Sequence, residues 1–410
     1  MLKEKMISYT KYSEAAFQES QIISFNKYDK QSNSFRVYKD GFAGIYFQFG
    51  KVDDKEGFKK AEDNLELKRP YPFDLESGKR SRDKTEVILS DQEILKTAKK
   101  VLSYLKKNYP DFVYEGSVFA VQTKNTMQND KGLDYSFTDG YNSISLTFKH
   151  KESKELCDGF LRFNQRTLKV RSFYKMADAY LANYLKEVPM PKECIIMKTY
   201  YDFTGKLAES IDAEKLKLGT SLLSGKIGQK LFADDFTLMH DVTEKNCWMN
   251  PFWDGEGVVN KGDKVTFIKN GKLLRGYADK KTAKKYRVKA TGSANTNFSD
   301  IPSNGYCTMT IKIGKKSAKE LLNGKLAIIP MLYSGGGFKE HGEYKMPVHV
   351  AFLTDGEQIL GRVPPFTMST TMFDMFGKDF IGIAKTNKLF NDKCILVKMK
   401  AEKLSSAAQN

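Results

Sequence analysis

The chain has 410 residues, of which 40% are hydrophobic and 12% aromatic, so it contains enough apolar side chains to bury a core. Its 67 Lys and Arg residues outnumber its 50 Asp and Glu residues, which gives a formal net charge of +17. Lysine and glutamate are interspersed without a dense basic block, so we interpret this charge as a solvated surface rather than a nucleic-acid site. The longest apolar runs are far shorter than the roughly 20 residues of a membrane helix, so no membrane partner is expected.

The N-terminus and the cysteines indicate the expected compartment. The first 20 residues include basic side chains but no apolar segment like that of a secretory signal. The cysteines are widely spaced and odd in number, and they form no C-x-x-C pair. We therefore expect a reduced, cytoplasmic protein. The five cysteines are Cys157, Cys194, Cys247, Cys307 and Cys394.

Four stretches of the N-terminal half space their apolar residues three or four positions apart, which is typical of an amphipathic helix. The clearest begins with a capping box, in which Ser90 and Glu93 satisfy free N–H groups of the first turn. It ends before Pro110, because proline cannot continue a helix. The other helices are expected at residues 12–21, after residue 53 and at residues 173–185.

Tight turns between apolar runs predict hairpins in the same half of the chain. Asp40 and Gly41 lie between two runs rich in aromatic and branched residues, and both positions of such a turn tolerate a positive φ. Residues 118–122 and 141–148 are also predicted as strands, connected through residues 129–132. Residues 68–84, which contain two prolines, are expected to form a loop.

The C-terminal half is rich in strand patterns and poor in helical ones. A capping box of Ser317 with Glu320 indicates one short helix, which Gly324 closes. Strands at short spacing with few helices favour a mostly antiparallel sheet or sandwich. The strands are predicted at residues 194–200, 265–269, 272–274 and 348–362, with Asn-Gly and Asp-Gly turns in the hairpins.

Pro189 and Pro191 mark the expected domain boundary, because two prolines so close together favour an extended connection. The predicted fold class is therefore α+β. Residues 1–188 are expected to form an N-terminal α/β-type domain with two long helices and hairpins. Residues 192–410 are expected to form a C-terminal domain that is mostly antiparallel β.

The most distinctive stretch of the chain is residues 201–236. Its second half, residues 219–231 (GTSLLSGKIGQKL), resembles the G-[TS]-S-x-x-S-G-[KR]-I-G block of the TldD/TldE (PmbA) family, historically labelled modulator of DNA gyrase. Further segments resemble elements of this family in the family's order, so the similarity extends from about residue 30 to about residue 400. These segments are residues 36–44, 129–134, 252–258, 270–283 and 290–294.

In that family the catalytic member carries the zinc motif H-E-x-x-x-H on the helix just before this block. An ungapped count assigns the three functional positions of the motif to Thr204, Gly205 and Glu209. Zinc needs neutral imidazoles or thiolates as ligands and a carboxylate as general base, and threonine and glycine supply none of these. The resemblance therefore implies that the chain has no catalytic or metal-binding residues of its own.

A second difference concerns the third zinc ligand, which in the catalytic subunit is a cysteine in a glycine-rich C-terminal loop. That loop is missing here, so Cys394 is expected to be a buried apolar residue of a strand. Both differences are typical of the TldE (PmbA) branch, whose members pair with a TldD-like catalytic subunit. The resemblance implies a non-catalytic subunit of a zinc metalloprotease that shapes the cavity, with no cofactor of its own and zinc only in the partner.

The resemblance also implies that the subunit binds an extended peptide substrate. A glycine-rich loop similar to residues 334–337 stands near the substrate cleft of TldD-like proteins, and its exposed backbone could bond a peptide by strand addition. A further candidate follows the family-like segment at residues 290–294. The expected substrate-binding residues are Ser334, Gly335, Gly336, Gly337 and Asn295.

Other polar residues are interpreted as structural. Asp254 and Glu256 could serve acid–base chemistry, but their flanking glycines favour a turn. His349 alternates with apolar neighbours, which is typical of a sheet residue rather than a metal ligand.

Two alternative functions stay open at this point. The chain would be a stand-alone homodimeric peptide-binding protein if no zinc-bearing partner exists. The historical family label and the net charge of +17 suggest a nucleic-acid or gyrase-associated regulator instead. The first alternative predicts a homodimer and the second predicts salt-dependent DNA binding.

Overall fold

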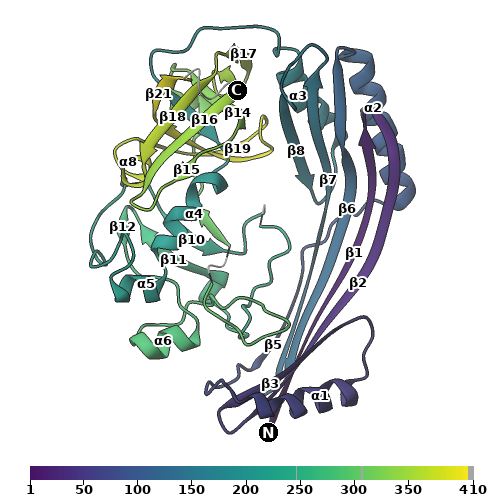
Figure 1. The fold of residues 1–410 in the computed structure, drawn as a ribbon, viewed down its shortest axis with the longest axis vertical. Helices are drawn as coiled ribbons and strands as arrows, with labels where there is room; N and C mark the ends of the chain where they lie inside the picture. Colours follow the sequence, from purple (N-terminus) through teal and green to yellow (C-terminus); the bar gives the residue numbers. More distant parts are fainter. Residues whose placement is uncertain (246, 306–307, 405–410) are drawn as a thin grey trace.

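The computed structural model describes residues 1–245, 247–305 and 308–404, so Cys307 lies outside the described residues. Strands in these ranges form three sheets of eight, four and nine strands. The eight-stranded sheet is a long curved wall along one side of the molecule, and the other two sheets lie one above the other beside it (Figure 1). Among the described helices, none is both long and apolar enough to cross a membrane.

Four long strands that pair antiparallel form most of the eight-stranded sheet. β1 (Leu2–Gln18) lies between β2 (Gln21–Lys39) and β6 (Phe112–Asn129), and β7 (Leu133–His150) follows β6. The order is β4-β3-β2-β1-β6-β7-β5, and β8 also pairs with β7. The shorter strands are β3 (Phe42–Phe49), β4 (Arg69–Pro70), β5 (Gly78–Asp83) and β8 (Gly159–Gln165).

Two predictions for this half of the chain are wrong. Residues 12–21, expected to be helical, belong mostly to β1. Tyr12 pairs with Tyr28 on one edge of β1 and with Val121 on the other, so ladders on both edges override the local helical spacing. The expected loop at residues 68–84 contains β4 and β5, and β5 pairs in parallel with β7.

The predicted helices and turns of the first half are otherwise confirmed. The capping box of Ser90 with Glu93 opens the long helix α2, and the carboxylate of Asp53 caps α1. Asp40 and Gly41 both have positive φ in the turn between β2 and β3. The helices are α1 (Asp54–Asp63), the 3-10 helix η1 (Asn64–Leu67), α2 (Asp91–Asn108) and α3 (Val170–Leu181).

The nine-stranded sheet is antiparallel except where β9 pairs in parallel with β14, which confirms a mostly antiparallel C-terminal half. Its order is β19-β20-β9-β14-β16-β18-β21, with β15 and β17 also paired to β16. The hairpin predicted at residues 348–362 is formed by β16 and β17. The strands are β9 (Ile195–Lys198), β14 (Ala327–Tyr333), β15 (Gly337–Phe338), β16 (Glu343–Thr354), β17 (Ile359–Val363), β18 (Phe366–Thr371), β19 (Phe380–Asn387), β20 (Asp392–Lys398) and β21 (Lys400–Lys403).

The four-stranded sheet and several short helices complete the C-terminal half. The predicted capping box of Ser317 with Glu320 is present, and the hairpin around Asn270 is confirmed. The strands are β10 (Leu238–Asp241), β11 (Lys264–Lys269), β12 (Lys272–Leu273) and β13 (Met309–Ile311). The helices are α4 (Tyr201–Ser210), α5 (Ala213–Leu218), η2 (Lys261–Asp263), α6 (Lys280–Tyr286), α7 (Ala318–Leu322) and α8 (Met372–Phe376).

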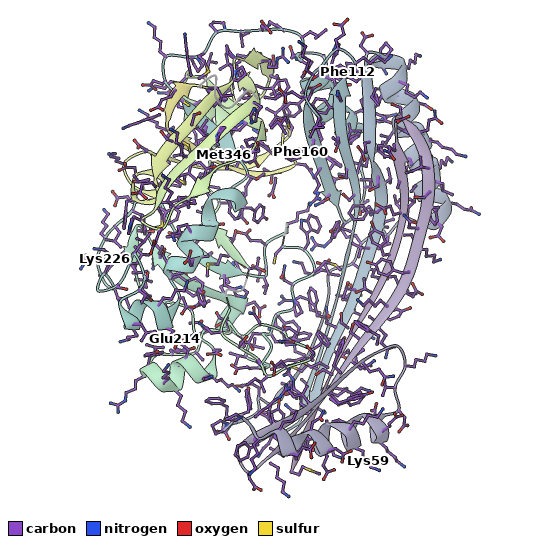
Figure 2. The ribbon with its side chains drawn as sticks, viewed as in Figure 1. Lys59, Phe112, Phe160, Glu214, Lys226 and Met346 are labelled. Atoms are coloured by element: carbon purple, nitrogen blue, oxygen red, sulfur yellow. The ribbon has the colours of Figure 1, made fainter. Side chains whose placement is uncertain are left out.

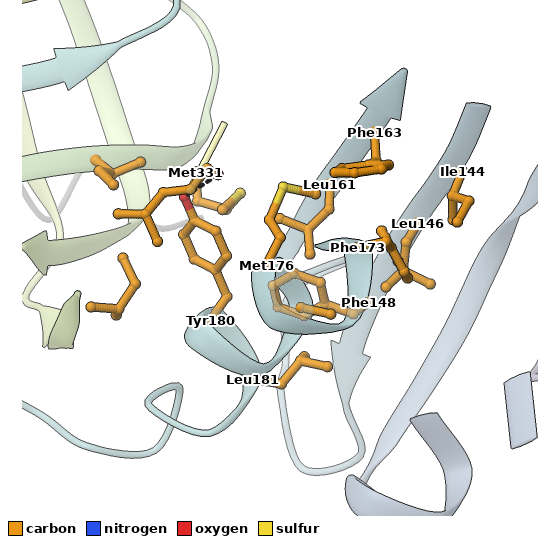
Figure 3. Close-up of a cluster of buried hydrophobic side chains, with 14 of the residues drawn as sticks. Ile144, Leu146, Phe148, Leu161, Phe163, Phe173, Met176, Tyr180, Leu181 and Met331 are labelled. Atoms are coloured by element: carbon orange, nitrogen blue, oxygen red, sulfur yellow. Dashed lines mark hydrogen bonds between the residues drawn. The ribbon is translucent and has the colours of Figure 1, made fainter. Parts of the chain in front are cut away.

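The largest apolar cluster joins the eight-stranded sheet to the nine-stranded sheet. Phe148 of β7, Tyr180 of α3 and Met331 of β14 belong to this one cluster (Figure 3). The hydroxyl group of Tyr180 donates a hydrogen bond of 3.1 Å to the carbonyl oxygen of Leu389, just before β20. Side chains from both halves therefore share one core. The domain boundary expected at residues 189–191 lies between α3 and β9 and stays a prediction.

Candidate functional site

One face of the eight-stranded sheet packs against α2 and α3, and the other face is turned toward the C-terminal half (Figure 1). On this second face Tyr12 pairs with Val121, and Val121 pairs with Tyr141, so the three side chains cross β1, β6 and β7 in one line. Further along the face, Trp253 packs on Tyr135 with ring centres 5.5 Å apart and covers that part of the sheet. Tyr12 and Tyr141 remain partly exposed.

A cavity of about 400 Å³ lies where this face meets the nine-stranded sheet. β8 contributes Phe160 and Arg162 to its wall, β14 contributes Met331, and the start of α4 contributes Tyr201. Phe160 lies beside the space between the two halves of the chain (Figure 2). A concave site of this size, with mostly apolar walls and a few polar groups, is typical of a ligand site.

Trp248 lies at the junction between this sheet face and the cavity, and a buried ion pair holds it there. Its ring centre is 5.2 Å from that of Tyr141, and the guanidinium carbon of Arg166 lies 4.5 Å from the centre of its ring. Arg166 donates hydrogen bonds of 2.8 and 2.9 Å to the two carboxylate oxygens of Asp139. The backbone N–H of Met249 donates to the same carboxylate at 2.9 Å. These bonds fix the segment carrying Trp248 onto the eight-stranded sheet.

Three polar groups give the cavity its chemical character. The Nζ atom of Lys198 lies 3.2 Å from the centre of the Tyr333 ring, a cation–π contact. Partial desolvation at the cavity wall raises the pKa of Tyr201 to about 12, so its hydroxyl keeps its proton at neutral pH and can donate it to an acceptor. Arg162 is exposed, and it contributes a guanidinium group to the cavity wall. The cavity can therefore hold an apolar group next to an oxygen acceptor.

Beside the cavity, Lys393 of β20 forms a buried hydrogen-bond network. Its Nζ atom donates to the carboxylate of Glu244 at 2.9 and 2.7 Å and to the carbonyl oxygen of Ile311 at 2.9 Å. It also donates to the hydroxyl of Thr310, which in turn bonds the hydroxyl of Tyr200 at 3.2 Å. Because this ammonium group has its donors engaged, we interpret Lys393 as a structural link that positions the start of α4 rather than as a catalytic base.

The three positions of the family's zinc motif lie on α4. Thr204 is buried, and its hydroxyl donates a 3.2 Å hydrogen bond to the helix backbone. A Cβ atom at Gly205 would meet nothing within 4 Å, so this position is open. Hydrogen bonds from Lys215 at 3.0 Å and Lys206 at 3.2 Å lower the pKa of Glu209. Within the described residues, no three His, Cys, Asp or Glu side chains lie close enough to hold a metal ion.

Of the glycine-rich residues 334–337, the first three connect β14 to β15, and Gly337 begins β15, which pairs with β16. The Oγ atom of Ser334 is 3.3 Å from Nε2 of His349, which lies on β16 as expected for a sheet residue. A Cβ atom at Gly336 would lie 2.2 Å from the carbonyl oxygen of Lys345, so close contact with β16 explains this glycine. Gly335 has a φ of +74° and open space around it. Peptide binding at this loop stays a prediction.

Asn295 lies in a different part of the chain from this loop. Its backbone N–H donates to the carbonyl oxygen of Ser303 at 2.8 Å, and its side chain would block any Cβ atom at Gly305. Neither Asn295 nor the loop of residues 334–337 lines the cavity. Cys394 of β20 is fully buried, and burial raises the pKa of its thiol to about 12, as expected for an apolar strand residue.

Asp254 and Glu256 form a buried turn rather than an exposed acid–base pair. The Asp254 carboxylate accepts hydrogen bonds of 2.9 Å from three backbone N–H groups, including that of Ala294. Glu256 accepts from the hydroxyl of Tyr71 at 3.1 Å and from the N–H of Lys280 at 2.9 Å. Burial raises the pKa of Asp254 to about 6, and burial together with the charge of Asp254 raises that of Glu256 to about 8.

The raised pKa of Glu256 predicts a pH dependence of stability. A carboxyl group whose pKa is higher in the folded state binds its proton more tightly when folded, so it destabilises the fold as the pH rises from its unfolded pKa to its folded one. The free energy of unfolding is expected to fall between about pH 5 and pH 8, by at most ~1.4 kcal/mol per pH unit from this residue. Urea unfolding across this range should give a flatter profile for Glu256→Gln, and equal slopes would contradict the assignment.

Sequence reasoning misses the cavity because its residues come from segments far apart in the chain. Phe160, Tyr201 and Trp248 lie on β8, on α4 and in the segment after β10. The alternation within β8 is a partial signal. Leu161 and Phe163 are buried in the main core, so the alternate side chains of Phe160 and Arg162 must point to the opposite face of the sheet.

Comparison with known proteins extends over nearly the whole chain. Residues 198–406 match a family described as PmbA/TldA metallopeptidase C-terminal domain. The crystal structure of TldE from Thermococcus kodakarensis aligns over 98% of this chain and 97% of that chain, with a TM-score of 0.81 and 17% identity, so the two share a fold.

Two archaeal proteins are similar in sequence. One, from Methanocaldococcus jannaschii and described as uncharacterized, is 24% identical over 74% of this chain and 76% of its own length. The other, from Methanothermobacter thermautotrophicus and described as a metalloprotease, is 26% identical over 39% of this chain and 36% of its own length. The chain therefore resembles the first relative over most of both lengths and the second over a smaller part.

Proposed function

This chain belongs to the PmbA/TldD family of metallopeptidases, and on that premise we propose that it is a TldE-like, non-catalytic subunit of a zinc metalloprotease. It pairs with a TldD-like subunit that carries the zinc motif, shapes one wall of the shared cavity and binds an extended peptide substrate. By itself it has no peptidase activity and no zinc.

The proposal rests on the residues that α4 carries at the positions of the zinc motif. Tyr201 at the start of this helix lines the cavity, so α4 begins at a ligand-sized space. At the positions of the zinc motif, however, the hydroxyl of Thr204 is hydrogen-bonded to the helix backbone and Gly205 has no side chain. The carboxylate of Glu209 accepts hydrogen bonds from two lysines. These groups cannot form a zinc site with a general base, so a partner has to supply the chemistry.

Affinity purification of the tagged chain from its host, with mass spectrometry and metal analysis, tests this proposal. A co-purifying chain with H-E-x-x-x-H and about one zinc ion per pair is the expected result. The pair should degrade an unfolded peptide, whereas the isolated chain should not. Stoichiometric zinc on the isolated chain would contradict the proposal.

The same preparation separates the alternative functions. A metal-free homodimer without a zinc-bearing partner would favour a stand-alone peptide-binding protein. Binding to DNA that weakens steeply with salt would favour a nucleic-acid role, whereas absence of binding at about 50 mM salt would remove it.

A further inference from the structure

We propose that the cavity takes a bulky apolar or aromatic side chain of an extended peptide, and that a row of aromatic rings leading to it holds further apolar side chains of the same peptide. The inference rests on the proposed function, because it names the class of peptide that the subunit binds. The aromatic row consists of Tyr28, Tyr12, Phe119, Tyr141 and Trp248.

Each ring of the aromatic row is in contact with the next. From Tyr28 to Trp248, successive ring centres are 5.0, 5.4, 6.0 and 5.2 Å apart. The row crosses β2, β1, β6 and β7, and its last member, Trp248, also lines the cavity. An extended peptide places the side chains of one face about 6.6 Å apart, which is close to this spacing. One peptide crossing the strands can therefore set a side chain against successive rings.

The rings at the outer end of the aromatic row and at the cavity are exposed rather than part of the core. Tyr28 is 48% exposed at the outer end, and Phe160 and Tyr201 are 51% and 47% exposed at the cavity. The four rings between them are partly exposed, and an apolar surface that stays accessible along its length is the kind that marks binding sites on folded proteins. A cavity of about 400 Å³ has room for one large side chain and part of the adjoining backbone.

The negative charge of Glu14 beside the aromatic row favours a peptide over a polyanion. Glu14 lies directly across from Phe119 in the strand pairing, two residues from Tyr12, so a negative charge stands beside the row. Single-stranded nucleic acids also stack on aromatic rings, but their sites line the backbone path with positive charge. At the cavity, the guanidinium group of Arg162 can donate hydrogen bonds to a carbonyl or carboxylate oxygen of a peptide.

A binding titration with the purified full chain tests the inference. The probe is a short fluorescein-labelled peptide with phenylalanine at every second position and polar residues between. The comparison probes are the same peptide with serine in place of phenylalanine and a labelled oligothymidine. Wild-type protein should bind the phenylalanine peptide only. The double variant Phe160→Ala/Tyr201→Ala should weaken this binding by about tenfold or more, because aromatic anchors carry much of the affinity of such contacts.

Phe49→Ala is the matched control, because Phe49 on β3 is also an exposed phenylalanine, 54% exposed, but lies outside the cavity. Its affinity for the peptide should equal that of the wild type. Equal binding of the two peptides, preference for oligothymidine, no binding of the phenylalanine peptide, or unchanged affinity of the double variant would each overturn the inference. None of these results bears on co-purification with a zinc-bearing partner, so the proposed function is judged separately.

Discussion

Replacing Arg36 with alanine is expected to lower the free energy of unfolding by about 3–5 kcal/mol, because it breaks a buried ion pair. Arg36 on β2 is fully buried, and its Nη1 atom donates to the carboxylate of Glu4 at 3.2 Å. The same guanidinium donates to the carbonyl oxygens of Gly255 at 3.0 Å and Asn297 at 2.8 Å, which belong to the C-terminal half. The variant would leave Glu4 buried without a counter-charge. Urea unfolding followed by circular dichroism measures the loss.

Arg69→Ala is the control for this prediction. Arg69 also reaches from the first sheet to the C-terminal half, where it pairs with Asp300 at 2.7 Å, but the two side chains are 36% and 53% exposed rather than buried. Its loss is expected to cost less than about 1 kcal/mol. Similar losses for the two variants would mean that the buried network around Arg36 does not anchor the two halves to each other.

Where one local rule decides a structure, the sequence is enough to predict it. The helix α2 has a capping box, a regular apolar stripe and a proline after its end, and all three agree. The turn at Asp40 and Gly41 needs positive φ at both positions, and the residue types indicate this directly. Each of these elements depends only on residues close together in the chain.

Where a local structure depends on contacts with residues far away in the chain, the sequence alone does not predict it. The segment around Tyr12 has helical spacing, but it is a strand because β2 and β6 supply hydrogen-bond partners on both of its edges. Arg36 is a similar case. Its segment shows the family resemblance, but the partners that give this arginine its role lie more than 200 residues away in Gly255 and Asn297.

The candidate site likewise has one part that the sequence predicts and one part that it does not. The residue types at Thr204, Gly205 and Glu209 can be read directly from the motif spacing, so the lack of zinc ligands at these positions follows from the sequence. The cavity cannot be predicted in this manner, because β8, α4 and the segment of Trp248 meet only when the sheets pack. The family resemblance thus assigns the zinc-motif positions to α4, and only the tertiary structure shows that a cavity lies at the start of this helix.

The charge of Asp139 links the stability of the fold to the shape of the proposed peptide site. Asp139→Asn keeps the size of the side chain but leaves Arg166 buried without a counter-ion, which is expected to cost about 3–5 kcal/mol. Since Arg166 packs on Trp248, the indole should also become more mobile and more solvated. A red shift of its fluorescence in a Trp253→Phe background, which leaves Trp248 as the sole tryptophan of the two in the chain, reports this change.

Glu187→Gln is the matched control, because Glu187 pairs with Arg362 at 3.1 Å but is 78% exposed. It should change the free energy of unfolding by less than about 1 kcal/mol and leave the fluorescence of Trp248 unaltered. If Asp139→Asn lowers stability without shifting the fluorescence, the ion pair holds the fold together but does not position Trp248. If both change and peptide affinity falls with them, the ion pair that ties the segment after β10 to the first sheet also sets the end of the aromatic row.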